Sequence, residues 1–441
     1  MNPHAIRRID AWVGKPACFI LTVLRRITNL VAPSKELPPI KKILLIKMIE
    51  QGATVLAYRA IRRAVERVGR ENVYFWVFQE NRFILDLLEL VPPENVIVIR
   101  TKKPLLLFWD LLKGAWQARQ LGIDATVDME FFSRASAILA FLTGARRRVG
   151  LHRFTSEGPY RGDLLTHRVQ HNPYLHVAAA YDLLVQALDR DPREIPLPKQ
   201  LVPAEDYSPP RFKATEAERT KVQAALDRLA GKPVQGPIVL LNPNASDLLP
   251  LRRWPTDRFI ELGQRILRDH PLATLAITGA PDEAEAAKGV AAKIGPSVIS
   301  LAGHTTLREL FVVYTMSDVL VTNDSGPGHF SSMTDITAIV LFGPETPAVF
   351  GPLGPGSKVV RTDLACSPCV NAFNHRFSPC NNNVCMQMIE IEDVYRLVRE
   401  QLAARGRMRL RVIDAAEHRI AAIDSESARS SAGKRDIPSI K

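Results

Sequence analysis

The segment 318–333, DVLVTNDSGPGHFSSM, decides the fold of this chain. It opens as an apolar, β-branched run typical of a buried strand and passes through a turn of small residues into the start of a helix. Similar apolar runs recur along the chain and are separated by helical segments. Strands that alternate with helices in this way predict parallel α/β sheets with helices on both faces.

The alternation of strands and helices occurs in two blocks. The first block starts with KKILLIK at 41–47 and the second with PIVLLNP at 237–243, and the stretch between them is polar and rich in proline. Two such blocks predict two doubly wound domains that face each other across a cleft. We therefore expect an N-terminal amphipathic helix at 1–39, a first Rossmann-like domain at 40–200, a linker with one helix at 201–236, a second Rossmann-like domain at 237–405, and a C-terminal helix with a disordered tail at 406–441.

The composition suits a large globular protein with an anionic partner. The 441 residues are 46% apolar and 24% charged, and the formal net charge is +12. This charge favours acidic lipid, phosphorylated substrates or nucleic acid, but the chain has no recognisable nucleic-acid-binding module. No run approaches the roughly 20 apolar residues of a spanning helix, and no secretory cleavage site is present. The sequence thus predicts a cytoplasmic protein.

The N-terminal region combines apolar and basic residues at helical spacing. A helix of this kind can lie on a lipid surface, or its apolar stripe can pack on the protein itself. We expect the first arrangement, which places the protein peripherally on the inner face of the cytoplasmic membrane. The apolar positions are Ile6, Ile9, Trp12, Val13, Ile20, Leu21, Leu24 and Ile27, and the basic ones are Arg7, Arg8, Lys15, Arg25 and Arg26.

The turn after the strand in 318–333 has the features of a phosphate-binding loop. Asp324, Ser325, Gly326 and His329 stand where a strand passes into a helix, so backbone N–H groups and the positive end of the helix dipole are exposed. Ser325 adds a hydroxyl donor, and Gly326 lets the backbone approach a ligand closely. An ordinary capped helix start would use Asp and Ser as well. The histidine in the same turn favours phosphate binding.

Two further strand-end loops suggest a nucleotide diphosphate. The loop 242–255, NPNASDLLPLRRWP, contains Asn244, Arg252 and Arg253, and arginine pairs well with a diphosphate. The loop TGAPDEAE places Glu283 at a helix start, where its carboxylate can accept ribose hydroxyls or simply favour the helix. Because ligands bind beyond the carboxyl ends of strands in doubly wound sheets, these loops predict one nucleotide-diphosphate site.

These motifs resemble those of the heptosyltransferase family, glycosyltransferase family 9. NDSGPGHFSSM and LFGPETP (341–347) are similar to the family segments D-[ST]-G-x-x-H-x-x-A and F-G-x-T-x-P. VDMEFFSRASAILAFLTGARRRVGL in the first block resembles D-x-x-x-x-x-R-S followed by G-A-x-x-R-I-G. The resemblance covers roughly residues 41–405 and implies a GT-B fold of two facing Rossmann-like domains.

The resemblance also implies inverting sugar transfer that requires no metal or other cofactor. It assigns the donor diphosphate and sugar to the loop after residue 323, the phosphate contact to Arg252, and the ribose contact to Glu283. Arg134 could face an anionic lipid-linked acceptor, as could Arg146–Arg148, although these arginines also suit a solvated surface. The predicted nucleotide-sugar-binding residues are Asn244, Arg252, Glu283, Asp324, Ser325, Gly326 and His329.

One departure from the family pattern concerns the catalytic base. Family members end the first strand in S-x-G-D, and the aspartate is the proposed base, whereas Ala53 stands at that position here. An inverting transfer needs a group that accepts the hydroxyl proton of the acceptor. We propose Glu50 for this role, although it could equally be a solvated loop charge. Asp128 and Glu130, after the strand ATVDM, are the reserve candidates.

Four cysteines cluster near the end of the second domain. CSPC and CNNNVC place Cys366, Cys369, Cys380 and Cys385 at a spacing that a structural zinc can use. His375 lies inside this loop and could substitute for one ligand. Reduced thiols, or disulfides formed after lysis, would explain the same residues.

The sequence therefore predicts a glycosyltransferase that uses a nucleotide sugar, such as ADP-heptose, and a lipid-linked or lipopolysaccharide-type acceptor. Two alternatives share the architecture. A sugar-nucleotide epimerase of the GT-B type would need neither a membrane helix nor an acceptor. A non-catalytic sugar-nucleotide-binding protein would explain the alanine at position 53.

Overall fold

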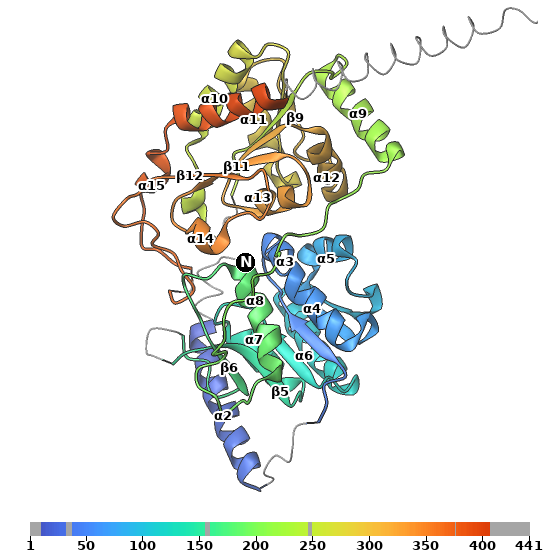
Figure 1. The fold of residues 1–441 in the computed structure, drawn as a ribbon, viewed down its shortest axis with the longest axis vertical. Helices are drawn as coiled ribbons and strands as arrows, with labels where there is room; N and C mark the ends of the chain where they lie inside the picture. Colours follow the sequence, from blue (N-terminus) through green and yellow to red (C-terminus); the bar gives the residue numbers. More distant parts are fainter. Residues whose placement is uncertain (1–9, 32–37, 155–158, 246–248, 375, 406–441) are drawn as a thin grey trace, which may run out of the picture.

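The computed structural model describes residues 10–31, 38–154, 159–245, 249–374 and 376–405. Within these ranges the chain forms two six-stranded sheets, one in each half, and the first half lies below the second in Figure 1. Neighbouring strands in both sheets are parallel. The predicted α/β class is confirmed.

The two sheets have the same strand order. It is β3-β2-β1-β4-β5-β6 in the first and β12-β11-β10-β7-β8-β9 in the second. In each sheet the order in which successive strands are added therefore reverses between the first and fourth strands, β1 and β4 or β7 and β10. Ligands bind at such a reversal point in doubly wound sheets. The strands are β1 (Ile43–Ile46), β2 (Val73–Phe78), β3 (Val96–Ile99), β4 (Ala125–Asp128), β5 (Arg147–His152), β6 (His167–Gln170), β7 (Ile238–Asn242), β8 (Thr274–Ile277), β9 (Ile299–Ser300), β10 (Val319–Asn323), β11 (Thr337–Phe342) and β12 (Lys358–Arg361).

Helices cover both faces of the first sheet. Residues such as Leu45 and Phe75 pack against α4, α5 and α8, while Leu44 and Trp76 point to the opposite face, against α6 and α7. Because both faces are covered, β1 reads as the unbroken apolar run ILLI. These helices are α3 (Gln51–Leu56), α4 (Tyr58–Val68), α5 (Arg82–Leu88), α6 (Pro104–Gln120), α7 (Arg134–Leu142) and α8 (Val177–Gln186).

The second sheet is covered in the same way. Val239 and Val321 face the layer of α10 and α11, whereas Leu240 and Leu320 face the layer of α9 and α12. Two short helices, α13 and α14, follow β10 and β11 at the edge that meets the first domain. The helices are α9 (Glu216–Ala230), α10 (Thr256–Asp269), α11 (Ala284–Ile294), α12 (Leu307–Met316), α13 (Gly326–Phe330), α14 (Pro347–Phe350) and α15 (Val384–Gln387).

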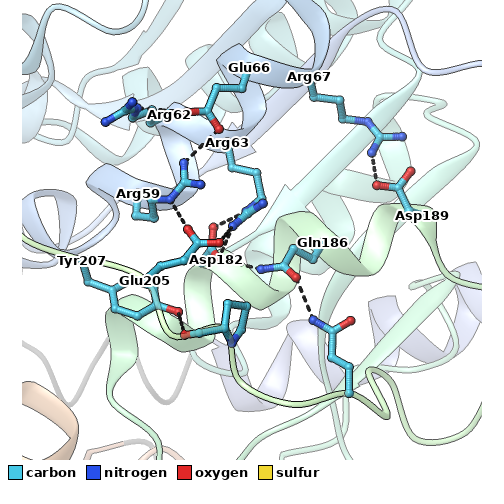
Figure 2. Close-up of polar contacts among 12 residues, drawn as sticks. Arg59, Arg62, Arg63, Glu66, Arg67, Asp182, Gln186, Asp189, Glu205 and Tyr207 are labelled. Atoms are coloured by element: carbon cyan, nitrogen blue, oxygen red, sulfur yellow. Dashed lines mark hydrogen bonds and ion pairs between the residues drawn. The ribbon is translucent and has the colours of Figure 1, made fainter.

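The segment predicted as a linker contacts both domains. Its helix, α9, starts with a capping box in which Thr215 and Glu218 exchange side-chain-to-backbone hydrogen bonds, and it packs beside α12. Upstream, Glu205 accepts a 2.5 Å hydrogen bond from Arg63 of α4, which also pairs with Asp182 of α8 (Figure 2). The linker therefore fastens α4 and α8 as well as joining the domains.

The N-terminal helix packs on the first domain along one side. It is α2 (Gly14–Val31), and Cys18 and Leu21 lie against α7. Ile20, Leu24 and Ile27 on its other side are half exposed. Part of the predicted stripe therefore packs on the protein, and part faces solvent. Ile6, Ile9, Arg7, Arg8 and the predicted C-terminal region 406–441 lie outside the described residues.

Candidate functional site

The strand-end loops of the two domains meet. Glu50 precedes α3 and Asp324 lies between β10 and α13, and these two short helices contact each other. A Cβ atom on Gly52 would lie 2.5 Å from Cδ2 of His329. A side chain at position 52 would therefore force His329 to shift, whereas glycine fits without this movement. The loops that carry Glu50 and Asp324 thus lie side by side.

A guanidinium group joins the two domains at this site. Arg376 donates from Nε to Oε1 of Glu345 at 2.7 Å and from Nη2 to Oε2 of Glu345 at 2.8 Å. Its third nitrogen, Nη1, donates to Oε1 of Glu50 in the first domain. The guanidinium lies 5.2 Å from the ring centroid of Phe350. Paired, charge-assisted bonds of this kind fix a guanidinium in one orientation.

A second arginine extends the cluster toward the loop after β10. Nη1 of Arg252 lies 3.5 Å from Glu345 and 3.6 Å from Oδ2 of Asp324. Arg252, Asp324 and Glu345 are all buried. We call Glu50, Arg252, Asp324, Glu345 and Arg376 the ion cluster. Its members follow β1, β7, β10, β11 and β12, so residues from both sheets converge at one point.

The pKa values of Asp324 and Glu50 are shifted in opposite directions, because burial and the nearby arginines act on them with different strengths. Burial raises the pKa of Asp324, and the charge of Arg252 only partly offsets this. Burial also acts to raise the pKa of Glu50, but the charges of Arg376, Lys47 and Arg252 outweigh it and lower this pKa to about 2. Glu50 is therefore ionised at neutral pH and is a weak base while Arg376 contacts it.

The ion pair between the domains has a strained backbone at both ends. Glu50 has φ 71° and Arg376 has φ 55°, in the left-handed region that favours glycine. Each such residue costs about 1–3 kcal/mol and persists only where the surrounding structure holds it. Strain of this kind is concentrated at functional sites. Its presence at both ends of one contact marks this junction as the candidate functional site.

Several polar atoms of the site have no hydrogen-bond partner among the described residues. They are Nε of Arg252, Nδ1 of His329 and Oδ2 of Asp324. Burial lowers the pKa of His329 to about 4, so its imidazole is neutral near pH 7. Buried polar groups are normally paired, and unpaired ones mark a place for a ligand or water. The unpaired guanidinium nitrogen of Arg252 suits an anionic ligand.

Known proteins of one family are similar in sequence to this chain. The model of glycosyltransferase family 9 (heptosyltransferase) matches residues 119–376. The chain belongs to this family. Lipooligosaccharide heptosyltransferase 2 of Campylobacter jejuni is 28% identical over 178 residues, which cover 40% of this chain and 54% of that protein. Lipopolysaccharide heptosyltransferase 2 of Salmonella typhimurium is 25% identical over 190 residues, or 42% of this chain and 49% of that protein.

Solved structures support the fold assignment of this family 9 chain. It resembles the Escherichia coli ADP-heptose lps heptosyltransferase II with a TM-score of 0.60 and 18% identity, over 83% of this chain and 99% of that one. A family 9 glycosyl transferase from Veillonella parvula gives a TM-score of 0.61 and 18% identity, over 84% and 99%. The predicted GT-B architecture is thus confirmed. The chain spans about half the length of the curated relatives it matches.

The remaining predicted donor residues of the family 9 chain lie beside the ion cluster or one strand away. The Ser325 hydroxyl donates to the carbonyl of Asn323 at 3.1 Å. Asn244 and Glu283 both flank Gly279 at the end of β8. Glu283 accepts the N–H of Ala280 at 2.7 Å, and burial raises the pKa of this carboxyl. Glu283 thus caps its own turn, and its ribose contact stays a prediction. Gly326 packs against Phe330, whose Cζ would lie 3.0 Å from a Cβ atom added at position 326.

The reserve base candidates are engaged in structural contacts. Asp128 is buried and accepts hydrogen bonds from Arg161 and Ser136, each at 2.8 Å. Glu130 accepts the backbone N–H groups of Met48 and Ile49 and the ammonium group of Lys47, at 2.6, 3.0 and 3.1 Å. Glu130 thereby braces the loop that carries Glu50, which leaves Glu50 as the better placed candidate.

Arg134, predicted to bind the acceptor, is buried and engaged. Its Nε donates to the carbonyl of Tyr160 at 2.8 Å, and Nη1 pairs with Asp10. The guanidinium therefore holds the segment before α2 against the first domain. A direct contact with an acceptor requires these bonds to open, and that role stays a prediction.

The four cysteines of the predicted zinc site are free thiols. In the part of the chain that the structure describes, no group of three or more His, Cys, Asp or Glu residues is close enough to hold a metal ion. Cys366 and Cys380 are exposed, Cys385 is buried, and burial raises the pKa of the Cys385 thiol. His375 lies outside the described residues. The described residues of this loop thus form no zinc site, and zinc binding stays a prediction.

Sequence reasoning missed two members of the ion cluster. Glu345 lies inside the quoted motif LFGPETP, so attention to its charge could have found it. Arg376 lies in the loop that carries the cysteines, and nothing in the sequence links it to Glu50. Their convergence depends on how the two domains pack.

Proposed function

We propose that this chain transfers a sugar from a nucleotide sugar to a lipid-linked or lipopolysaccharide-type acceptor, with inversion and without a catalytic metal. The ion cluster at the domain junction carries this proposal, because it places the buried Arg252, the half-buried Arg376 and one strained carboxylate where the loops of both sheets meet. The heptosyltransferase names of the curated relatives support ADP-heptose as the donor.

The donor diphosphate would bind near Arg252 in this proposal. Arg252 has an unpaired Nε, and burial favours the neutral form of Asp324, which removes a charge that would repel phosphate. Ser325 and the neutral His329 lie in the adjacent loop and turn. Arginine pairs with phosphate through two parallel hydrogen bonds, which would fix the leaving group.

Glu50 would act as the base. The acceptor oxygen bonds to the anomeric carbon while the bond from that carbon to the diphosphate oxygen breaks, and the hydroxyl proton moves to Glu50. Arg376 now shares its charge between Glu50 and Glu345. A diphosphate that draws Arg376 toward itself would weaken its contact with Glu50. The pKa of Glu50 would then rise, so donor binding would activate the base.

A ligand panel tests the donor site. Thermal unfolding in EDTA, with a chelator-free control, is followed with ADP, UDP, GDP, dTDP and their sugar conjugates. A ligand at roughly 100 times its dissociation constant stabilises the folded state by about 2.7 kcal/mol. We expect ADP and ADP-heptose to raise the melting temperature, Arg252→Met to abolish the shift, and the exposed Arg396→Met to keep it. If only UDP or GDP raises the melting temperature, the donor is a sugar conjugate of that nucleotide and not ADP-heptose. If no nucleotide raises it, the proposed donor site is refuted.

Ala53 favours one second function, a sugar-nucleotide-binding protein without transfer activity. The two functions differ in turnover rather than in donor binding. A protein that binds ADP-heptose but releases no ADP in the presence of an acceptor would support the binding function.

We also propose that α2 holds the protein on the inner face of the cytoplasmic membrane. In the described ranges, no helix is both long and apolar enough to span a bilayer. Phe19, Ile20 and Leu24 of α2 point toward solvent, and the exposed Lys15 and Arg26 lie on the same helix. An exposed apolar stripe flanked by basic residues suits a lipid interface.

A further inference from the structure

Helix α6 has an apolar stripe on its solvent side. Leu105, Trp109, Leu112 and Trp116 are 75%, 64%, 39% and 63% exposed, and their spacing of four, three and four residues aligns them along one side of the helix. Phe108 adjoins this stripe and is 58% exposed. Water therefore covers large apolar side chains that normally lie inside a fold or in an interface.

The outward direction of this stripe is fixed by the packing of the inner side of α6. A Cβ atom on Gly114 would lie 2.7 Å from the ring of Trp76, so the helix approaches the sheet as closely as glycine permits. Ala115 and Ala118 are buried on the same inner side. Because small residues face the sheet, rotating α6 to bury its tryptophans would produce clashes.

Helices α6 and α2 flank the same helix, α7. Leu139 and Ala140 of α7 belong to the cluster that includes α6, while Ala137 of α7 packs with Cys18 of α2. In Figure 1, α2 runs along the outer flank of the lower domain, next to α7. The exposed sides of α2 and α6 therefore border one flank of the first domain, which we call the α2–α6 face.

Tryptophan and basic residues are concentrated at this face. Of the five tryptophans, Trp109 and Trp116 lie on α6 and Trp12 just before α2, and these three are exposed, whereas the other two are buried. Tryptophan is enriched at membrane–water interfaces because its ring is apolar and its N–H is polar. Lys102, Lys103, Lys113 and Arg119 are exposed at α6, and Lys15 and Arg26 at α2.

Exposed carboxylates are absent from both helices. The segment Gly14–Val31 contains no acidic residue. The one acidic residue of α6, Asp110, is buried and accepts hydrogen bonds from Arg100 at 2.8 Å. The charge on the α2–α6 face is thus of one sign and complements an anionic surface.

We propose that the α2–α6 face docks on an anionic lipid bilayer, with α6 as a second membrane-binding element beside α2. The inference rests on the membrane location in the proposed function and adds the element that orients the first domain on the lipid. Apolar side chains would enter the interfacial region, while the lysines would lie at the headgroups. A second copy of the chain would be repelled by the like charge of this face, so lipid is the favoured occupant.

Vesicle binding by the full chain, without donor or acceptor, tests this proposal. We expect binding to vesicles that contain phosphatidylglycerol and much weaker binding to pure phosphatidylcholine. Trp109→Gln with Trp116→Gln should lower the partition coefficient about tenfold, since each change removes apolar area that would be buried in the lipid. Lys102→Glu with Lys113→Glu should lower it by about thirtyfold or more, because two attractive charges are lost and two repelled charges are added near the anionic surface.

Matched changes far from the α2–α6 face control for nonspecific effects. Leu272→Ser removes an even more exposed apolar side chain, and Lys288→Glu reverses an exposed charge, both in the second domain. These variants should bind vesicles as the parent does. Unchanged binding by the α6 variants would overturn the proposal. So would a parent dimer that dissociates on Trp109→Gln and Trp116→Gln. Donor-induced shifts in melting temperature test the proposed transferase separately, because vesicle binding requires no donor.

Discussion

The fourth strand of each sheet leads to a buried aspartate, and the two aspartates differ in how well their environment satisfies them. Asp128, at the end of β4, accepts hydrogen bonds from Arg161 and Ser136 at 2.8 Å and from the backbone of Glu130 at 3.0 Å. Asp324, after β10, lies 3.6 Å from Arg252, and its Oδ2 accepts no hydrogen bond in the described structure. The same topology thus places a fully hydrogen-bonded carboxyl group in one domain and a buried carboxyl group with an unpaired oxygen in the other.

The largest expected effect is on turnover and concerns the strained carboxylate opposite Asp324. Glu50→Gln should lower kcat by about 10²–10⁴-fold, because the amide cannot accept the acceptor proton. Donor binding should be retained, and the variant should melt somewhat below the parent because its neutral amide loses the charged contact with Arg376. Glu285→Gln, on the exposed side of α11, is the matched control. Intact turnover in Glu50→Gln would show that the base lies elsewhere.

The next prediction separates the two aspartates directly. Asp128→Asn should lower the free energy of unfolding by about 3–5 kcal/mol, because it leaves the buried guanidinium of Arg161 without its charged partner. Asp324→Asn should cost less than about 1 kcal/mol, since no hydrogen bond to Oδ2 is lost. Urea unfolding of both variants measures the difference. Equal losses would remove the distinction between a structural and a ligand-binding carboxylate.

Arg376 should control the pH dependence of transfer. Arg376→Gln removes the largest charge effect that lowers the pKa of Glu50 in the free enzyme, so the acid limb of the kcat/KM profile should move up by about 1–3 pH units. Arg376→Lys keeps the charge and should restore most of the profile, while Arg396→Gln should leave it unchanged. An acid limb that does not move in Arg376→Gln would mean that the group titrating in kcat/KM is not Glu50.

A smaller effect is expected in the pH dependence of stability. Burial raises the pKa of Asp324 to about 8, so the folded state holds this proton after the unfolded chain has released it. Stability contributed by the protonated form is therefore lost as the pH rises from about 4, the ordinary carboxyl value, through about 8. Asp324→Asn should gain in melting temperature relative to the parent across this interval. If the melting temperatures of the parent and Asp324→Asn change with pH in parallel, the pKa of Asp324 is not raised.

The smallest effect concerns the cysteine loop. If its thiols gather around zinc, added zinc should raise the melting temperature modestly, and Cys366→Ser with Cys369→Ser should abolish the rise. Metal analysis of protein purified without chelator gives the stoichiometry. Protein that carries no zinc and does not respond to it would leave these cysteines as ordinary thiols.

Much of the candidate site could be found from short segments. Arg252, Asp324 and His329 lie together as the strand-end loops suggested, and Glu50 lies opposite them. Glu283 lies one strand further along, beside Asn244 of the loop that carries Arg252. Arg134 proved to be buried against Asp10 and Tyr160, because a basic residue at a helix start can pair with the protein as readily as with a ligand.

The sequence by itself determined the strands, the helices and the loops that carry chemistry, because apolar periodicity and turn residues act over a few positions. Only the tertiary structure decided that Arg376 bridges Glu345 and Glu50, since this contact joins distant segments and depends on how the domains pack. It also decided which side of α6 faces solvent. An apolar helix can lie in a core or on a surface, and here the small residues that fit against Trp76 turn the tryptophans outward.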